Sequence, residues 1–207
     1  MNKRGHWVFA ATYDPLSGPL ERAILGERRM RLLAGLDGRV LDVGSGTGVN
    51  LPYFRQASRV VAAEPDPAMR RRLAAKLGAA HVPVEVTGDA AETLTHPDSS
   101  FDAVVFTLVL CSVASPDRAL AEARRVLRPS GRLVVLEHVR GGGQLARWQD
   151  RVTPLWSRVN AGCHLGRETG AAIERAGFTV ERAEYFDPFP RWVPARPLLE
   201  AVARRGG

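Results

Sequence analysis

Short apolar segments rich in β-branched residues alternate with longer amphipathic segments along this chain of 207 residues. The alternation is typical of βαβ units and predicts an α/β fold with a mainly parallel sheet. The segment RPLLEAVARR near the C-terminus fits a strand or a helix by periodicity alone. With that segment included, the predicted strands are Val40–Val43, Val60–Ala63, Val84–Thr87, Ala103–Thr107, Leu133–Glu137, Val180–Phe186 and Leu198–Ala203.

The longer segments repeat apolar residues at helical spacing. They predict helices over Leu20–Leu33, Pro67–Leu77, Pro116–Leu127, Gln144–Val159 and Arg167–Arg175, and a short one from Val49. Ser115 is a suitable N-cap for the third helix, and Gly177 a suitable C-cap for the fifth. In Gln144–Val159, the residues Leu145, Trp148, Val152, Leu155 and Val159 share one face. The length predicts a single domain over residues 1–207.

The net charge of +7 invites a nucleic-acid interpretation. All basic residues except Lys3 and Lys76 are arginines, scattered through helical segments without interleaved aromatic residues, which favours a solvated surface. Peripheral attraction to an anionic membrane stays open. No apolar run approaches the roughly 20 residues of a membrane span, and the N-terminus lacks the apolar core of a signal peptide, so we expect a cytoplasmic protein.

Cys111 and Cys163 lie far apart in the sequence and show no metal-ligand spacing, so no metal is expected. Cys111 lies in the apolar run VVFTLVLCSV, where a buried thiol acts as a small hydrophobic side chain.

The stretch VLDVGSGTGVNLPYF predicts a strand, then a turn containing Gly44, Gly46 and Gly48. Glycines let backbone N–H groups approach a ligand closely. Val49 occupies the place of the third glycine of a dinucleotide fingerprint, and Asp42 would repel a pyrophosphate. The turn therefore suits a ligand with an ammonium group and sugar hydroxyls.

Two further acids follow predicted strands. Glu64 ends the second strand, where a carboxylate accepts hydrogen bonds from both ribose hydroxyls. Asp89 ends the third strand and can accept from an adenine amino group beside the Ala90 N–H, although an N-cap role explains it equally well. Met69 lies one helical turn beyond Glu64 and can pack on a purine.

Together, LDVGSGTG, VVAAEPD, GDAAETL and VLRPSGRLVVLEH resemble the motifs of class I S-adenosylmethionine-dependent methyltransferases. The resemblance implies a Rossmann-like, seven-stranded, mostly parallel sheet with an antiparallel last strand and helices on both faces. It implies S-adenosyl-L-methionine as cofactor and S-adenosyl-L-homocysteine as product. The residues it assigns to the cofactor are Tyr13, Gly44, Ser45, Gly46, Asn50, Glu64, Pro65, Met69, Asp89, Ala90, Thr107 and Leu108.

The segments FTLVLCSVASPDRALAEARRVLRPSGRLVVLEHV and GCHLGRET are similar to methyltransferase-like proteins that methylate thiols, and less closely to bacterial phospholipid and quinone methyltransferases. The chain departs from the pattern at Glu64 (commonly Asp), Ser130 (Gly) and His164 (often Cys), and lacks the hydrophobic N-terminal anchor of membrane-bound members.

The acceptor is expected to be a small hydrophobic molecule, with a thiol slightly preferred. We expect residues 1–36 to form a helical lid and residues 141–166 an insertion beside the acceptor. Trp148 and Trp156 would line that insertion. Packing on the sheet explains Trp148 equally well and Trp156 better. His138 and His164 are candidate proton acceptors, with hydrogen bonding at a strand end and capping as the alternatives, and His164 would also contact the acceptor.

Two other functions stay open: a phospholipid amine or quinone methyltransferase at a membrane surface, and more distantly an RNA-binding or RNA-modifying protein. No nucleic-acid partner is expected, and the oligomeric state is not predicted.

Overall fold

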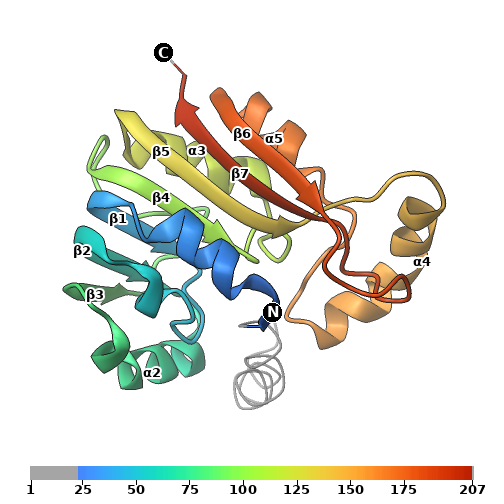
Figure 1. The fold of residues 1–207 in the computed structure, drawn as a ribbon, viewed down its shortest axis with the longest axis horizontal. Helices are drawn as coiled ribbons and strands as arrows, with labels where there is room; N and C mark the ends of the chain where they lie inside the picture. The colour runs from blue at the N-terminus through green and yellow to red at the C-terminus, as the bar shows by residue number, and fades with distance from the viewer. Residues whose placement is uncertain (1–22, 207) are drawn as a thin grey trace.

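A computed structural model describes residues 23–206 and contains one seven-stranded sheet in the order β3-β2-β1-β4-β5-β7-β6 (Figure 1). The strands are β1 (Asp37–Val43), β2 (Gln56–Ala63), β3 (Val84–Thr87), β4 (Phe101–Thr107), β5 (Leu127–His138), β6 (Phe178–Phe186) and β7 (Leu198–Arg205). The helices are α2 (Pro67–Ala75), α3 (Pro116–Val126), α4 (Gly143–Val159) and α5 (Thr169–Arg175), with short 3-10 helices η1 (Leu51–Tyr53) and η2 (Leu77–Ala79). Residues 23–33 are also helical, whereas residues 1–22 of the expected lid lie outside the described part.

Strands β1 to β5 pair in parallel, and β7 is antiparallel to both β5 and β6. All seven predicted strands are confirmed, including the ambiguous segment at the C-terminus. The strand order reverses between β1 and β4, so loops that leave their C-terminal ends diverge. Ligands of open α/β sheets bind at such a point.

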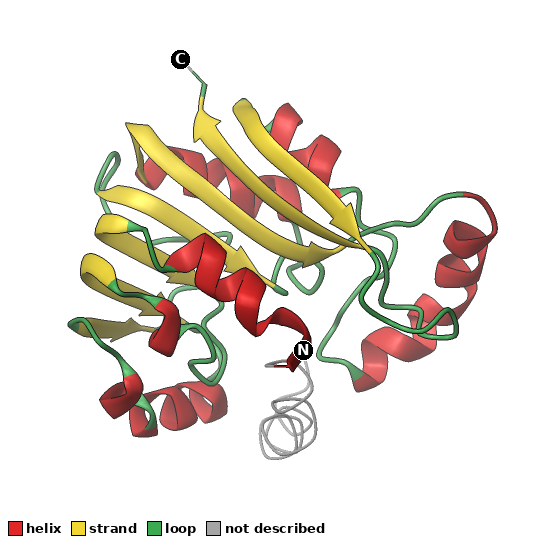
Figure 2. Cartoon of the chain, in the orientation of Figure 1, coloured by secondary structure: helices red, strands yellow, loops and turns green. Residues whose placement is uncertain are grey.

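Helices cover both faces of the sheet, as predicted (Figure 2). The helix of residues 23–33 buries Leu25 and Leu33 against one face, in a cluster with Val105 of β4. On the other face, α3 and α5 bury Leu120 and Ile173 in the largest apolar cluster. Because both faces of the sheet are covered, β4 is mostly apolar and β1 is buried over its last four residues.

The helix ends follow the expected capping chemistry. The Ser115 side chain accepts from Arg118 N at the start of α3, and Gly177 has a φ of +80° after α5. At the glycine turn, the short helix expected from Val49 is instead the 3-10 helix Leu51–Tyr53. Gly48 has a φ of +84°, which is not helical, so the helix begins only at Leu51, with Pro52 in its first turn.

The apolar face predicted for α4 is only partly buried. Leu155 and Val159 have 67% and 64% of their surface exposed, because α4 extends beyond the end of the sheet (Figure 1). The buried Gln149 holds α4 in place instead. Its side chain accepts from Gly141 N at 2.8 Å and donates to three backbone carbonyls, among them that of Arg196 at 2.8 Å.

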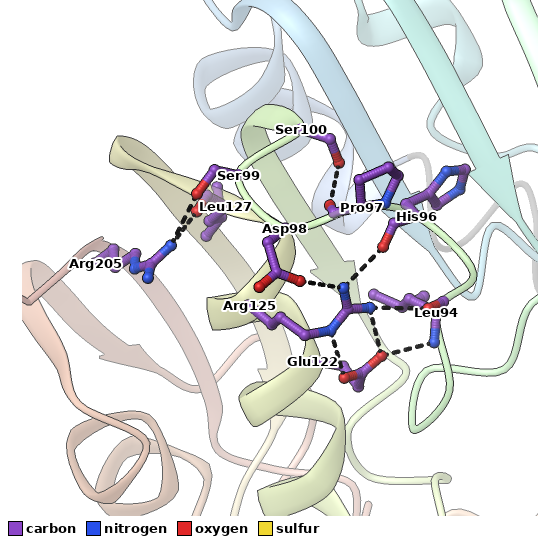
Figure 3. A network of polar contacts seen from close by, with 10 residues as sticks. All are labelled: Leu94, His96, Pro97, Asp98, Ser99, Ser100, Glu122, Arg125, Leu127 and Arg205. Carbon is purple, nitrogen blue, oxygen red and sulfur yellow. Dashed lines mark hydrogen bonds and ion pairs between the residues drawn. The ribbon is translucent and has the colours of Figure 1, made fainter.

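An arginine network fixes the opposite edge of the sheet, where β4 begins (Figure 3). The Arg125 guanidinium donates to both oxygens of Glu122, to Asp98, and to the carbonyls of Leu94 and His96. These bonds lower the pKa of Glu122 and tie the loop before β4 to α3. A shallow surface hollow beside Arg125 contains none of the predicted site residues.

No helix in residues 23–206 combines the length and apolar character needed to cross a membrane.

The buried carboxylate of Glu200 in β7 should contribute strongly to stability. It accepts from Arg28 at 2.9 Å, Arg31 at 2.8 Å and Arg182, and thereby joins the helix of residues 23–33 to β6 and β7. Glu200→Gln removes this charge and should lower the free energy of urea unfolding by roughly 2 kcal/mol. The control Glu181→Gln breaks only the exposed pair with Arg204 and should cost less than about 1 kcal/mol. Equal losses would contradict this role.

Candidate functional site

The glycine turn after β1 leaves open space above Gly46. All three of its glycines have positive φ: Gly44 +65°, Gly46 +57° and Gly48 +84°. A Cβ at Gly44 would lie 2.6 Å from a methyl group of Val109, so the turn and the loop after β4 are in close contact. Among residues 23–206, a Cβ at Gly46 would meet only the Gly44 carbonyl, at 3.9 Å. The backbone above Gly46 is therefore accessible to a ligand.

Asp42, the last polar residue of β1 before the turn, is completely buried. Its Oδ1 accepts from Asn50 Nδ2 at 2.7 Å, whereas its Oδ2 has no hydrogen-bond partner among residues 23–206. Burial raises the Asp42 pKa to about 6, opposed by the bond from Asn50. Asn50 Nδ2 also donates to Thr107 Oγ1 at 2.9 Å, so these side chains join the ends of β1 and β4. The free oxygen of Asp42 suits a cationic ligand.

Glu64 extends from the end of β2 across the glycine turn. Its carboxylate accepts from Gly46 N at 2.9 Å and from Asp66 N at 2.8 Å, and only 7% of the residue is exposed. Burial is the main cause that raises its pKa. Met69, in the first turn of α2, is buried, and Pro65, which directly follows Glu64, is exposed. Glu64 therefore lies where the sequence predicted an acceptor for sugar hydroxyls.

Asp89 follows β3, farther along the same edge. Its carboxylate accepts from Thr95 Oγ1 at 3.0 Å and from Thr87 Oγ1 at 3.3 Å, and it lies 3.4 Å from His96 Nε2. Ala90 forms an isolated antiparallel bridge with Thr93. The acid is thus held by its own loop, with the Ala90 backbone beside it.

The loop after β4 is shaped by Glu137 of β5. Leu108 begins this loop with a φ of +59°. The buried Glu137 carboxylate then accepts from the backbone N–H groups of Val109 at 2.6 Å, Leu110 at 2.8 Å and Cys111 at 3.4 Å. Burial raises the Glu137 pKa to about 7, and these hydrogen bonds oppose the shift. No local sequence signal marks this role, since a carboxylate ending a strand is common.

Two cysteines and a histidine meet beside this loop. Cys111 Sγ, His138 Nδ1 and Cys163 Sγ all lie within 4.8 Å of one another, with 3.8 Å between His138 Nδ1 and Cys163 Sγ. Both cysteines are buried and reduced. A hydrogen bond from Cys111 and the neighbouring His138 lower the Cys163 pKa, whereas the same pairing and burial raise that of Cys111. Sequence analysis did not predict this cluster, because the three residues lie far apart in the sequence.

The cysteines belong to an apolar cluster at the end of the sheet, called the acceptor wall after the acceptor expected beside residues 141–166. Its residues are Cys111, Val152, Trp156, Cys163, Leu165, Val193 and Ala195. Trp156 of α4 packs against this cluster. Trp148 is half-buried on α4 but is not part of the wall, and the His164 side chain is exposed while its N–H donates to the Cys111 carbonyl at 2.8 Å. Tyr13 lies outside the described residues.

Comparisons with known proteins agree with this geometry. Residues 41–135 match the family model described as a methyltransferase domain. The chain is 40% identical over 180 residues to thiol S-methyltransferase TMT1B of Mus musculus, covering 83% of this chain and 73% of the relative. The chain belongs to the S-adenosylmethionine-dependent methyltransferases.

This methyltransferase also shares 36% identity over 141 residues with phosphatidylethanolamine N-methyltransferase of Cereibacter sphaeroides, covering 67% of this chain and 66% of the relative. A putative methyltransferase from Bacillus halodurans has the same fold, with a TM-score of 0.72 at 19% identity over 87% of this chain and 98% of the other. The residues present fit the cofactor of this family: within the described part of the chain, Asp42 Oδ2 is a buried acceptor without a hydrogen-bond partner, and the space above Gly46 is open.

The raised pKa of Glu137 predicts a pH-dependent stability. Between the ordinary carboxyl pKa of 4.5 and about 7, the folded protein retains a proton that the unfolded chain releases. The Glu137 contribution is therefore complete below pH 4.5 and is lost as the pH rises through 7. Glu137→Gln should remove this pH-dependent contribution. Between pH 4.5 and about 7, the unfolding free energy of the variant should therefore fall by up to about 3 kcal/mol less than that of wild type.

Urea unfolding at several pH values from 4 to 8 measures this slope. Glu122→Gln is the matched control, because the Glu122 pKa is lowered and its removal changes the slope with the opposite sign, in the acidic range. An unchanged slope in Glu137→Gln would contradict the assignment.

Proposed function

We propose that this methyltransferase transfers a methyl group to the sulfur of a small apolar thiol. The observation that carries the proposal is the acceptor wall, an apolar cluster around Cys111, Cys163 and His138 beside the loop that contacts the glycine turn. The identity of 40% to a protein named thiol S-methyltransferase also supports it.

The cofactor would be held by groups at the C-terminal ends of the first four strands. When bound, S-adenosylmethionine supplies an electrophilic methyl group on a cationic sulfur. Glu64 would accept hydrogen bonds from the ribose hydroxyls, and Asp42 Oδ2 would accept from the ammonium group. Asp89 and Ala90 would bind the adenine, with Met69 against its face. The rest of the cofactor would be lined by Gly44, Ser45 and Gly46 and by the backbone of Thr107 and Leu108.

The acceptor wall would supply alignment and exclusion of water. An apolar wall holds a hydrophobic thiol without competing hydrogen bonds. Correct alignment of two reactants contributes as much as ~7–11 kcal/mol to a reaction barrier. Because a free thiol has a pKa near 8.5, only a modest bias toward the thiolate is needed near neutral pH. His138, half-buried at the end of β5, is the wall-side group able to accept that proton. A role of the exposed His164 stays a prediction.

Replacement of Glu64 should weaken cofactor binding. Glu64→Ala removes both carboxylate oxygens above Gly46, and each hydrogen bond to a charged group contributes roughly 1.5–3 kcal/mol. Calorimetric titration with S-adenosylhomocysteine should therefore show an affinity at least tenfold lower than that of wild type. The exposed Glu27→Ala serves as a control and should titrate like wild type. Unchanged binding by Glu64→Ala would place the ribose elsewhere.

Incubation with S-adenosylmethionine and small alkyl or aryl thiols should yield thioethers, detected by mass spectrometry. His138→Ala should lower kcat for the thiol at least tenfold and leave the affinity for S-adenosylhomocysteine within about twofold, because His138 lies on the acceptor side. Methylation confined to lipid amines or quinones would refute the thiol proposal.

A specific observation favours a second candidate, methylation of a lipid amine or quinone at a membrane surface. Leu155 and Val159 on α4 are exposed, as is 76% of Trp192 in the loop before β7. The identity to phosphatidylethanolamine N-methyltransferase agrees with such an acceptor. Sedimentation with anionic liposomes at low salt, lost in Leu155→Ser with Trp192→Ser, would support this candidate; no sedimentation would count against it.

A further inference from the structure

We propose that Cys111, His138 and Cys163 bind one zinc ion and leave its fourth coordination position for the acceptor thiol. The assignment of the fourth position to a thiol rests on the proposed function. The metal site itself rests only on the convergence of three ligand atoms from the loop after β4, the end of β5 and the segment after α4.

The spacing of the ligand atoms fits tetrahedral zinc. Zinc binds thiolate sulfur at about 2.3 Å and imidazole nitrogen at about 2.0 Å, which places two sulfur ligands about 3.8 Å apart and a sulfur and a nitrogen about 3.6 Å apart. His138 Nδ1 and Cys163 Sγ are 3.8 Å apart, and Cys111 Sγ is within 4.8 Å of both. Movements of a few tenths of an ångström to about 1 Å close the set around an ion.

The backbone holds the ligands in this arrangement. The Cys111 N–H donates to the Glu137 carboxylate, and the Cys111 carbonyl accepts from His164 N at 2.8 Å. The Cys163 N–H donates to the Asn160 carbonyl at 2.9 Å. The two segments that carry the thiols are therefore bonded directly to each other, so less ordering is required when the ion binds.

The charge balance also favours a cation. Zinc binding would release the protons of both thiols. Two thiolates and a neutral imidazole then carry two negative charges inside an apolar cluster, where unpaired charge is costly. A divalent ion neutralises them. Soft thiolate ligands select zinc over magnesium or calcium.

Three protein ligands are typical of zinc sites that act on a substrate, because structural sites are closed by four. An acceptor thiol that enters the fourth position displaces a water molecule and releases its proton to solvent. The zinc ion then keeps the acceptor sulfur deprotonated at neutral pH, so that its lone pair can attack the methyl group. In the absence of zinc, His138 would have to accept the thiol proton. The thioether product has no thiolate charge and leaves readily.

Metal binding is tested on the full chain, reduced and freed of metal by a chelator. Cobalt(II) added alone should give thiolate-to-metal charge-transfer absorption, and zinc(II) should displace it at one ion per chain. Cys163→Ser and His138→Ala should each lower the zinc affinity by about 100-fold or more. The exposed His81→Ala is the matched control and should bind like wild type.

Addition of a small thiol to the cobalt-loaded protein should intensify the charge-transfer band, as a third sulfur binds. Absence of thiolate-to-cobalt absorption in the reduced protein, or equal binding by Cys163→Ser, would overturn the site. Formation of a Cys111–Cys163 disulfide, with no metal bound after reduction, would do the same.

Activity separates this inference from the proposed function. Zinc bound through the three residues without thiol methylation overturns the thiol acceptor and leaves the metal site standing. Undiminished thiol methylation by chelator-treated protein overturns the metal role and leaves the proposed function standing.

Discussion

The buried carboxylate of Glu137 is the constraint on which the functional edge of this methyltransferase depends. It accepts the N–H groups of three consecutive residues, beginning at Val109, and so fixes a loop that starts from Leu108 in the left-handed region. One side of this loop contacts Gly44 in the glycine turn, and the other carries Cys111 into the acceptor wall. A single side chain of β5 therefore sets the relation between the glycine turn and the cluster that contains Cys111.

The same edge concentrates buried carboxylates, which a parallel sheet makes possible. Strands β1, β2 and β5 run in the same direction, so Asp42, Glu64 and Glu137 lie at or just beyond the same ends of their strands, each desolvated and each with a raised pKa. Burial of these groups lowers stability near neutral pH. The opposite edge compensates with charge pairs near solvent, such as those of Arg125, which cost little desolvation (Figure 3).

The sequence predicted all seven strands and the caps of α3 and α5, because these features depend on local periodicity and local hydrogen bonds. It also placed Glu64 beside the glycine turn, since the ends of parallel strands share one edge. It did not predict the meeting of Cys111 with Cys163, which depends on how the segment after α4 returns to the sheet. The exposure of Leu155 escaped prediction because an apolar face reveals amphipathicity but not whether the sheet extends far enough to cover it.

The position of α4 follows from these nonlocal contacts and bears on how an acceptor enters. Gln149 binds three carbonyls from the end of β5 and the loop before β7, so α4 is fixed to the sheet through one polar side chain near its middle. The turns beyond it place Trp156 against the wall and leave Leu155 exposed. Adjacent residues of α4 therefore present apolar surface both to the wall and to solvent. Such a surface would favour hydrophobic acceptors, whatever atom is methylated, because the desolvation of a charged acceptor at the wall would be costly.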